Sequence, residues 1–446
     1  MADTEPAGRG AGTRRRFLKS AVAAAGLAGV RPPIARAASQ TLALHGGTPA
    51  VKVPPERLEA LTHWPRFGPQ EKKIVADMLD HDSTSVYDII PTLEQRWREY
   101  HKMPYAKLFC NGTSALTAMY FALDLPPGSE IMVPSYTFFG TILPMRFFGL
   151  VPVFVDLDPR TACFDVEDAA RRLTPRTRAL VPMHSWGLPC DMDRICAFAR
   201  EHGLVVCEDA AHAHGASLQG IQMGAWGETS IVSFQATKPL PGIEGGAGLY
   251  RDRTLYERAS VFGDYKAPAG LPADSPYRVY AGTGLGLKLR IHPLAAALVH
   301  RQLDDLESRN DLITAQVRRL NDRITRLPGV SEPFCRKDAR RVYYSSNLIF
   351  IDEARAGCPL ETLLKALRAE GVSASSGHYP EQHRLAVYAE AKWWHHPVEV
   401  PASLPGTEQV NRTAVNLPLL RDEAPELIDM YAAAFEKVWA HRRDLA

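Results

Sequence analysis

The feature that most constrains the fold is an alternation of short apolar runs with helical segments, which starts near residue 68. The runs have strand length, and segments with a helical pattern, such as 114–123 and 192–202, separate most of them. Crossovers of this kind are right-handed and return the chain to the same sheet, so we predict an α/β fold with a mostly parallel central sheet. The predicted strands are 106–110, 130–133, 152–155, 179–183, 204–207 and 230–234.

The same patterns divide the chain into five parts. Residues 68–292 form the predicted large α/β domain, and the stretch 293–330, rich in Leu, Ala, Arg and Asp, predicts a connecting helical region. Residues 331–446 contain one strand candidate, 346–351, and two helix candidates, 360–370 and 425–439, which predict a smaller α+β domain. Residues 38–67 are an N-terminal segment, and residues 1–37 are interpreted separately.

The first 37 residues have the order of features found in export signals. Residues 13–19, Thr-Arg-Arg-Arg-Phe-Leu-Lys, resemble the twin-arginine pattern, and a mildly apolar run follows from 21 to 30. Residues 35–37, Ala-Arg-Ala, match the small-x-small pattern that a signal peptidase cleaves. We therefore expect export to the periplasm or beyond; a basic tail on a cytoplasmic protein is the alternative.

Composition gives no support to several classes of protein. The formal net charge is only +2, which does not favour nucleic acid or an anionic membrane surface as a partner. The seven cysteines, at 110, 163, 190, 196, 207, 335 and 358, form no CxxC pair, so we expect buried thiols and no metal site. Outside the leader, no stretch is apolar for the length that a stable membrane insertion needs.

The first site motif is Cys-Asn-Gly-Thr-Ser-Ala-Leu at 110–116, which follows a strand and opens a helix. Gly112 permits close backbone approach, and the free amides of Thr113 and Ser114 would then point toward an anion. Taken alone, the motif is a weak sign of phosphate binding, because an ordinary turn and helix cap has the same pattern.

The second site motif is Val-Val-Cys-Glu-Asp-Ala-Ala-His at 205–212. Asp209 stands at the end of a buried strand, where ligands meet parallel sheets, and its carboxylate could pair with a protonated ring nitrogen. His212, three residues on, could reach the phenolic oxygen of the same ring. A helix cap for Asp209 and a packed core position for His212 stay open at this point.

The third site motif is Ser-Phe-Gln-Ala-Thr-Lys at 233–238, before Pro239 and a Gly-rich stretch. Ser233 could bind a phosphate. Lys238 follows a buried strand, and a lysine that forms a Schiff base must be unprotonated and held in place by its surroundings. An exposed lysine of no special role is the alternative.

In this order, the motifs resemble the DegT/DnrJ/EryC1/StrS family of pyridoxal-phosphate-dependent aminotransferases, which includes the sugar aminotransferases. The likeness runs from about Leu42 to about Leu420 and rests on the segments LALHGGTPAV, NGTSAL, VPSYTF, PVFVDLDP, LVPMHSWGLPCDMD, CEDAAHAHG, SFQATK and GIEGGAG. The resemblance implies fold type I, the aspartate-aminotransferase-like fold, with pyridoxal 5'-phosphate as cofactor. It also implies a homodimer whose active sites lie at the interface.

The resemblance further implies a role for each matching residue. Lys238 would hold the cofactor as a Schiff base and carry protons, and Asp209 would bind the pyridine nitrogen. His212 would contact the phenolic oxygen, and Phe138 would stack on the ring. The cofactor phosphate would be held by Thr113, Ser114 and Ser233, next to Gly112. His184 and Trp186 match a family segment whose role is either structural or a contact with substrate.

The sequence departs from the family pattern at two places. Lys288 stands in Gly-Leu-Lys-Leu-Arg, where the family usually has an Asn that reaches the cofactor phosphate of the neighbouring subunit. We predict that the Lys288 ammonium takes this place as a point charge for the cofactor phosphate or for an anionic substrate group; a solvated lysine before a helix is the alternative. Residues 82–87 lack the usual TxGP-like stretch that shapes the substrate pocket, so a nucleotide-linked sugar is a less secure expectation.

The residues matched to the cofactor site would stabilise a carbanion, which several pyridoxal-phosphate reactions share. They do not determine which of these reactions follows. We expect an aminotransferase that moves an amino group from Glu or Gln to a keto sugar, keto cyclitol or related carbonyl. Another pyridoxal-phosphate reaction, such as racemisation, elimination or oxidation, and a non-catalytic binding protein are the alternatives. The dehydratase branch of the family has His in place of the lysine, and Lys238 is intact.

Overall fold

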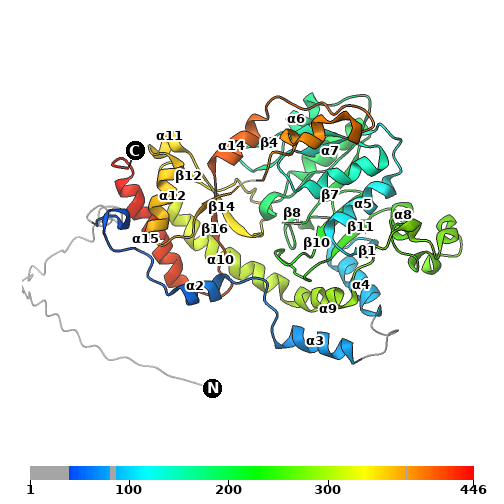
Figure 1. The fold of residues 1–446 in the computed structure, drawn as a ribbon, viewed down its shortest axis with the longest axis horizontal. Helices are drawn as coiled ribbons and strands as arrows, with labels where there is room; N and C mark the ends of the chain where they lie inside the picture. The colour runs from blue at the N-terminus through cyan, green and yellow to red at the C-terminus, as the bar shows by residue number, and fades with distance from the viewer. Residues whose placement is uncertain (1–39, 81–86, 378, 446) are drawn as a thin grey trace, which may run out of the picture.

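The computed structural model describes residues 40–80, 87–377 and 379–445, and its centre is a seven-stranded sheet (Figure 1). Six strands run in one direction, and the seventh, β11, is antiparallel to both neighbours. In spatial order the strands are β1 (Tyr105–Phe109), β11 (Gly246–Tyr250), β10 (Thr229–Ser233), β7 (Val205–Asp209), β6 (Thr177–Leu180), β2 (Glu130–Pro134) and β3 (Val151–Val155). The α/β prediction is confirmed, and the six predicted strands are the six that share a direction.

β11 is the strand that the sequence does not predict, because Gly-Ala-Gly-Leu-Tyr looks like a loop. It lies inside the sheet between β1 and β10. A Cβ on Gly246 would come within 2.6 Å of the Asn111 carbonyl carbon, so this glycine permits the close contact between β11 and the chain entering helix α5. Sheet packing thus overrides the local preference of the segment.

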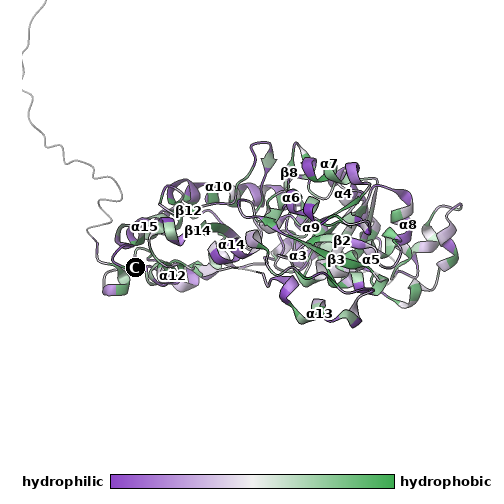
Figure 2. Ribbon diagram, turned by 90° about the horizontal axis from the view of Figure 1, so that it is seen from above, coloured by the Kyte–Doolittle hydropathy of each residue, from purple (hydrophilic) through white to green (hydrophobic). Residues whose placement is uncertain are grey.

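Helices cover both faces of this sheet. One core contains residues of α4 (Ile89–His101), α7 (Met192–His202) and α9 (Pro293–Gln302), and the other contains residues of α5 (Gly112–Leu123) and α8 (Arg253–Val261). Along β2, Met132 belongs to the first core, whereas Ile131 and Val133 belong to the second, as the two-residue period of a strand requires. Figure 2 shows apolar residues concentrated on the central elements β2, β3 and α5.

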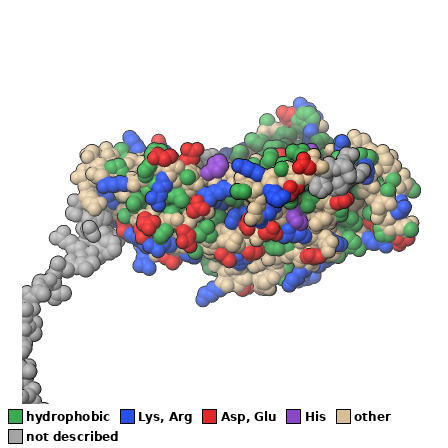
Figure 3. Space-filling model, turned by 90° about the horizontal axis from the view of Figure 1, so that it is seen from below, with side chains coloured by type: hydrophobic (Ala, Val, Ile, Leu, Met, Phe, Trp, Pro, Cys, Tyr) green, Lys and Arg blue, Asp and Glu red, His purple; other side chains and the backbone are tan. Residues whose placement is uncertain are grey.

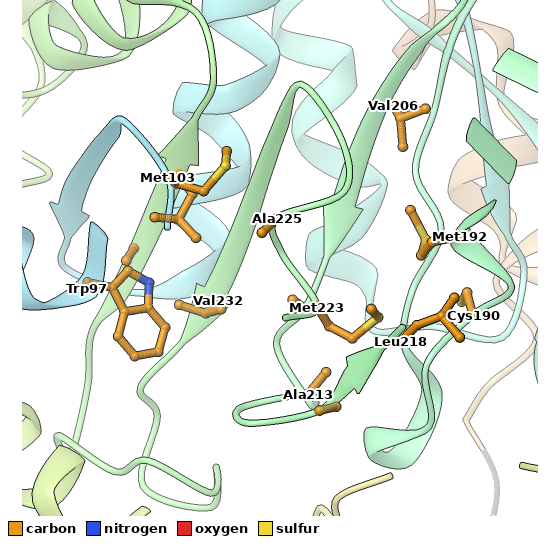
Figure 4. Packing of buried hydrophobic residues seen from close by; sticks show 14 of the residues in the cluster. Trp97, Met103, Cys190, Met192, Val206, Ala213, Leu218, Met223, Ala225 and Val232 are labelled. Carbon is orange, nitrogen blue, oxygen red and sulfur yellow. The ribbon is translucent and has the colours of Figure 1, made fainter. Parts of the chain in front are cut away.

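Figure 4 shows part of the first core, in which Trp97 of α4 lies near Val232 of β10 and Cys190 lies near Met192. Five of the seven cysteines are buried and the other two are partly exposed, and none forms a disulfide. Within the described residues, no group of His, Cys, Asp and Glu side chains is arranged to hold a metal ion.

The C-terminal part forms a second layer around a four-stranded antiparallel sheet. Its strands, in spatial order, are β12 (Val330–Ser331), β14 (Ser346–Ile351), β16 (Ala414–Pro418) and β15 (Ser375–Ser376). Helices α10 (Leu306–Ile324), α12 (Leu360–Ala369) and α15 (Pro425–His441) contribute to its core. The predicted connecting helical region is α9 and α10, joined by a short 3-10 turn at Leu303–Asp305.

The N-terminal segment is fixed to this smaller part by a buried ion pair. The Lys437 ammonium lies 2.8 Å from a carboxylate oxygen of Glu370, and both side chains are almost fully buried. The Glu370 carboxylate also accepts hydrogen bonds from the amides of Ala43 and Ala50, and Lys437 donates to the carbonyl of Thr48. Residues 43–50 therefore pack as part of the small domain.

Part of the C-terminal region returns to the large domain. The Gln382 amide donates to the carbonyl of Ser135, and Tyr388 and Trp394 are buried in the same core as Phe154 of β3. In Figure 1 this segment lies on the large domain, between β15 and α14 (Pro405–Thr413) in the chain. The domain limits at 292 and 330 stay a prediction. The segment between β15 and α14 packs on the large domain, although it lies in the part of the chain predicted to form the small one.

The surface carries charges of both signs. Figure 3 shows Lys and Arg side chains interspersed with Asp and Glu over the face seen from below. None of the helices in the described ranges is long and apolar enough to cross a membrane. The predicted export signal, at 1–37, lies outside the described residues.

Candidate active site

The predicted site residues converge on one cavity of about 500 Å³ at the carboxyl ends of β7 and β10. Seven of the nine predicted residues line it: Gly112, Thr113, Phe138, Asp209, His212, Ser233 and Lys238. Its other walls include Tyr344 and Tyr379, which belong to the C-terminal region. The cavity therefore lies where ligands bind in parallel sheets, between the two layers of the molecule.

Asp209 ends β7 and is 3% exposed. Its carboxylate accepts hydrogen bonds from the Thr141 hydroxyl at 2.7 Å and from the Ala211 amide at 3.1 Å. Burial raises the pKa of this carboxyl, while the two hydrogen bonds and the positive charge of Lys238 oppose the rise. A buried carboxylate at a cavity wall gains strongly from a cationic partner, and a protonated pyridine nitrogen is such a partner.

His212 is 2% exposed and lies between two tyrosines. Its ring stacks on Tyr344 with centroids 4.0 Å apart, and its Nε2 is 3.2 Å from the Tyr379 hydroxyl. Burial, and then the charge of Lys238, lower the pKa of His212 well below its ordinary value, so the imidazole is neutral at pH 7. The buried Nδ1 has no hydrogen-bond partner in the described part of the chain, which leaves it for a ligand in the cavity.

Lys238 has its side chain in the cavity and is not ion-paired with any described carboxylate. Its Nζ lies 4.1 Å from the centroid of the Tyr344 ring. The backbone of the turn is fixed by the Lys238 amide, which donates to the carbonyl of Gln235 at 2.8 Å, and by Trp64, whose Nε1 donates to the Lys238 carbonyl at 3.0 Å. A lysine without a carboxylate partner, held on a fixed turn, suits covalent attachment to a carbonyl.

The predicted anion-binding motif is built around the start of α5. Asn111 caps the helix, and its Oδ1 accepts the Ser114 amide at 2.8 Å, so that amide is not the free donor expected from the sequence. The Ser114 hydroxyl faces the Cys110 sulfur at 3.2 Å, and Ser114 does not line the cavity. A Cβ on Gly112 would lie 2.9 Å from the Ser233 Cβ, so glycine brings α5 against the end of β10.

Two predicted cofactor residues lie at or beyond the edge of the cavity. Phe138 lines it with 49% of its surface exposed and packs against Phe139. Lys288 is exposed and does not line the cavity of its own chain. The next residue, Leu289, accepts the Cys110 amide at 2.7 Å, which places Lys288 close in the chain to the anion-binding motif.

Glu208 and His184 form a buried structural pair beside the site. The Glu208 carboxylate accepts the amides of Gly224, Trp226 and Gly227 at 2.7–2.8 Å and His184 Nε2 at 3.1 Å. Although burial acts to raise the pKa of Glu208, the His184 bond and the amides hold it below its ordinary value. The sequence left the role of His184 open between structure and substrate; these contacts and its full burial give it a structural one.

Sequence reasoning missed the walls that the C-terminal region supplies. Tyr344 and Tyr379 line the cavity, and Trp186, left open in the sequence, stacks on Tyr344 and donates through Nε1 to the Tyr136 hydroxyl. Thr141 and Glu244 line the same cavity. These side chains have no local pattern that marks a site, because only the packing of distant segments brings them there.

Comparison with known proteins agrees with this geometry. Residues 65–436 match the sequence profile of the DegT/DnrJ/EryC1/StrS aminotransferase family. The chain belongs to this family. A putative L-glutamine:3-amino-2,3-dideoxy-scyllo-inosose aminotransferase from Streptoalloteichus tenebrarius is 32% identical over 359 residues, which cover 78% of this chain and 82% of that protein.

Solved structures of the DegT family share the fold. An aminotransferase from Psychrobacter cryohalolentis superposes with a TM-score of 0.76 and 26% identity, over 86% of this chain and 99% of the other. DesI, solved in the presence of its TDP-sugar product, gives a TM-score of 0.72 and 28% identity, over 91% and 97% of the two chains. The chain is therefore a transaminase, and its cofactor is pyridoxal phosphate. The fold predicted from its motifs is confirmed.

The residues present fit that cofactor. Asp209 offers a buried carboxylate for the ring nitrogen, His212 offers an unpartnered buried nitrogen, and Lys238 offers an amine that forms no ion pair with a described carboxylate. Thr113 and Ser233 line the cavity on the side where α5 begins, as a phosphate group requires.

Proposed function

We propose that this enzyme moves an amino group from glutamate or glutamine to a keto sugar, keto cyclitol or related carbonyl compound. The observation that carries the proposal is the convergence of Lys238, Asp209 and His212 on one cavity whose residues fit pyridoxal phosphate. The substrate class is supported by the relatives, which include the scyllo-inosose aminotransferase and DesI with its TDP-sugar.

Each residue in the cavity has a defined task in this proposal. Bound pyridoxal phosphate supplies an electron sink that stabilises negative charge on the carbon bearing the amino group. Lys238 would hold the cofactor covalently through Nζ, and its amine would take up the proton that leaves the donor carbon. Asp209 keeps a proton on the pyridine nitrogen, and neutral His212 contacts the phenolic oxygen. Tyr344 and Tyr379 supply aromatic walls beside these groups.

The test is the donor half-reaction of the purified, cofactor-loaded protein. Glutamate or glutamine should convert the pyridoxal spectrum into the pyridoxamine spectrum, and a panel of keto sugars and keto cyclitols should then restore the first spectrum. A bound cofactor that neither donor changes would contradict transamination. If only a carbonyl compound outside the panel restored the pyridoxal spectrum, the proposed acceptor class would be contradicted.

We also propose a homodimer in which Lys288 serves the partner's active site. Lys288 is exposed, outside its own cavity, and flanked by the exposed apolar side chains Leu285 and Leu287, which a subunit interface would cover. Its ammonium would act as a point charge for the cofactor phosphate or for an anionic substrate group.

A mixing experiment tests this arrangement. Lys238→Ala and Lys288→Ala should each be inactive or impaired, and a mixed dimer should contain one site with both defects and one intact site. Refolding the two variants together should therefore restore part of the activity. Confirmed mixed dimers as inactive as their parents would assign Lys288 to its own subunit, and full activity of Lys288→Ala alone would remove its role.

Finally, we propose that the protein is exported in folded form, on the evidence of the motif at 13–19 and the cleavage pattern at 35–37. A fusion of residues 1–40 to a folded reporter should be exported, and changing Arg14, Arg15 and Arg16 to Lys should stop it. Unchanged export of the Lys version would indicate a general secretory signal.

A further inference from the structure

A second cavity, of about 280 Å³, adjoins the backbone of the Lys238 turn, because Trp64, which lines it, donates to the Lys238 carbonyl. Three segments far apart in the chain form it: Trp64 of the N-terminal segment, Arg309 of α10 and Arg421, which follows β16. The Arg421 guanidinium lies 4.5 Å from the centroid of the Trp64 ring, and that of Arg309 lies 5.4 Å from it. Two cations therefore gather around one indole.

Neither of these two arginines has an anionic partner in the described part of the chain. Arg309 donates to the side-chain and backbone oxygens of Gln302, at 2.6 and 2.9 Å, which are neutral acceptors. The Arg421 guanidinium makes no hydrogen bond there. In both side chains Nε is buried and without a partner. Both side chains are half-buried, and a buried guanidinium nitrogen normally has a partner, so their unpaired Nε atoms require a reason.

The acids that line the cavity or lie beside it are already paired with other arginines. Asp305 is 3.0 Å from Arg301, and Asp422 is 2.7 Å from Arg66. Burial lowers the pKa of both Arg309 and Arg421 to about 10, and at Arg421 the charges of Arg309 and Arg66 add to the effect. At Arg309 the charges of Asp305 and Glu71 oppose the fall in pKa, but neither acid forms an ion pair with it. The cavity therefore holds two guanidinium groups that no described carboxylate pairs with directly.

We propose that this cavity is a binding site for a small oxyanion, a carboxylate or a phosphate, held between the guanidinium groups of Arg309 and Arg421. Guanidinium donors match the paired oxygens of both anions. An anion there would give the Arg421 guanidinium, which makes no hydrogen bond in the described part of the chain, a partner and would offset the mutual repulsion of the two cations. The indole of Trp64 forms an apolar wall that keeps the guanidinium planes in place.

The site is mechanically connected to the reaction centre. Trp64 donates through Nε1 to the carbonyl of Lys238 at 3.0 Å, and Arg309 donates to the carbonyl of Pro239 at 3.4 Å. The same side chains thus face the anion and hold the turn that carries the lysine. An occupied site fixes that turn more firmly, so the anion should also alter the absorption of the Lys238-bound cofactor; only this last readout rests on the proposed function.

The experiment uses the full, cofactor-loaded protein, in which the cofactor phosphate already fills its own site. Inorganic phosphate and glutarate are titrated separately by calorimetry, at constant ionic strength in chloride. We expect saturable binding of at least one of them at one site per chain. Phosphate alone would identify a phosphate site, and glutarate alone a carboxylate site.

Variants locate the binding. Arg421→Gln and, separately, Arg309→Gln should each weaken it by tenfold or more. Arg319→Gln is the matched control, because Arg319 lies on the same helix α10 but is exposed and paired with Asp429. Its affinity should equal that of the wild type. Circular dichroism and cofactor absorbance verify the fold of each variant, and the two cavity variants give independent tests if one of them fails to fold.

Two results would overturn the proposal: no saturable binding of either anion, or unchanged binding in a folded Arg421→Gln or Arg309→Gln protein. The donor half-reaction is measured on the same preparations. An active enzyme that binds neither anion refutes the second site alone, whereas an inert cofactor in a protein that binds the anion refutes the proposed function alone.

Discussion

Glu208 and Asp209 are adjacent acids with different tasks, and a pair of isosteric substitutions separates them. Glu208→Gln removes one acceptor oxygen from a carboxylate that accepts four hydrogen bonds, two at each oxygen. Whichever way the amide turns, its NH₂ group meets two donors: Trp226 and Gly227, or Gly224 and His184. His184 cannot change tautomer to accept, because its Nδ1 already accepts the Cys190 amide.

The loss of unfolding free energy follows from the two donors that are left without an acceptor. A buried donor left without an acceptor costs about 1–3 kcal/mol, so two orphaned donors destabilise the protein by about 2–6 kcal/mol. The substitution leaves Asp209 and the cavity walls in place, so the remaining folded protein should retain turnover close to that of the wild type.

Asp209→Asn should have the opposite effect: a small loss of stability and a large loss of turnover. Its amide can donate to the Thr141 hydroxyl, which then donates to Thr137, 2.8 Å away, so the hydrogen bonds persist and stability should fall by only about 1 kcal/mol or less. Without the negative charge, however, the ring nitrogen loses the group that keeps it protonated. Turnover should fall by about 10²–10³-fold, the usual loss when one preorganised charge interaction is removed.

The assay compares urea unfolding, followed by both circular dichroism and fluorescence at one saturating cofactor concentration, with turnover of the folded protein. An unchanged urea midpoint for Glu208→Gln would refute the count of orphaned donors. Turnover near that of the wild type in Asp209→Asn or Asp209→Ala would show that Asp209 is only a structural acid at the end of β7.

Three further changes test other parts of the structure. Lys238→Ala should abolish the borohydride-reducible link to the cofactor and its visible absorption while circular dichroism stays unchanged; a link that persists would assign the attachment to another lysine. Burial and the charge of Lys238 lower the pKa of His214 to about 3, so the unfolded chain binds a proton near pH 6.5 that the folded chain does not, and stability falls as pH falls. Between pH 8 and pH 5 the loss of unfolding free energy should be about 2 kcal/mol smaller in His214→Phe than in the wild type, as measured by denaturant unfolding. The exposed control His202→Phe should lose as much as the wild type. Equal pH profiles for His214→Phe and the wild type would contradict the buried neutral imidazole. Lys437→Met leaves the Glu370 charge buried and unpaired and should cost about 3–5 kcal/mol of unfolding free energy with little effect on cofactor affinity; a cost below about 1 kcal/mol would contradict the anchoring role of this pair.

The sequence by itself determined the parallel sheet and the residues at its carboxyl edge. Apolar runs in alternation with helices set strand direction, because each right-handed crossover brings the chain back to the same side. Asp209, Ser233 and Lys238 follow directly from this, since each stands at or just after the end of a strand, and such ends meet along one edge. A local pattern is enough to place residues whose position depends on the nearest strand.

Tertiary structure decided what contacts those residues. β11 forms in spite of its glycines because it is paired on both sides, and the Ser114 amide is taken by Asn111 although the motif suggests a free helix end. Tyr344 and Tyr379 reach the cavity, and Trp64 reaches the backbone of the Lys238 turn, from segments about 100 residues or more away in the chain. Such contacts depend on how whole layers pack. Glu208 and Asp209 are both buried, and their different partners separate their roles: Glu208 accepts four hydrogen bonds, whereas Asp209 lines the cavity, so neither role can be read from the neighbouring sequence.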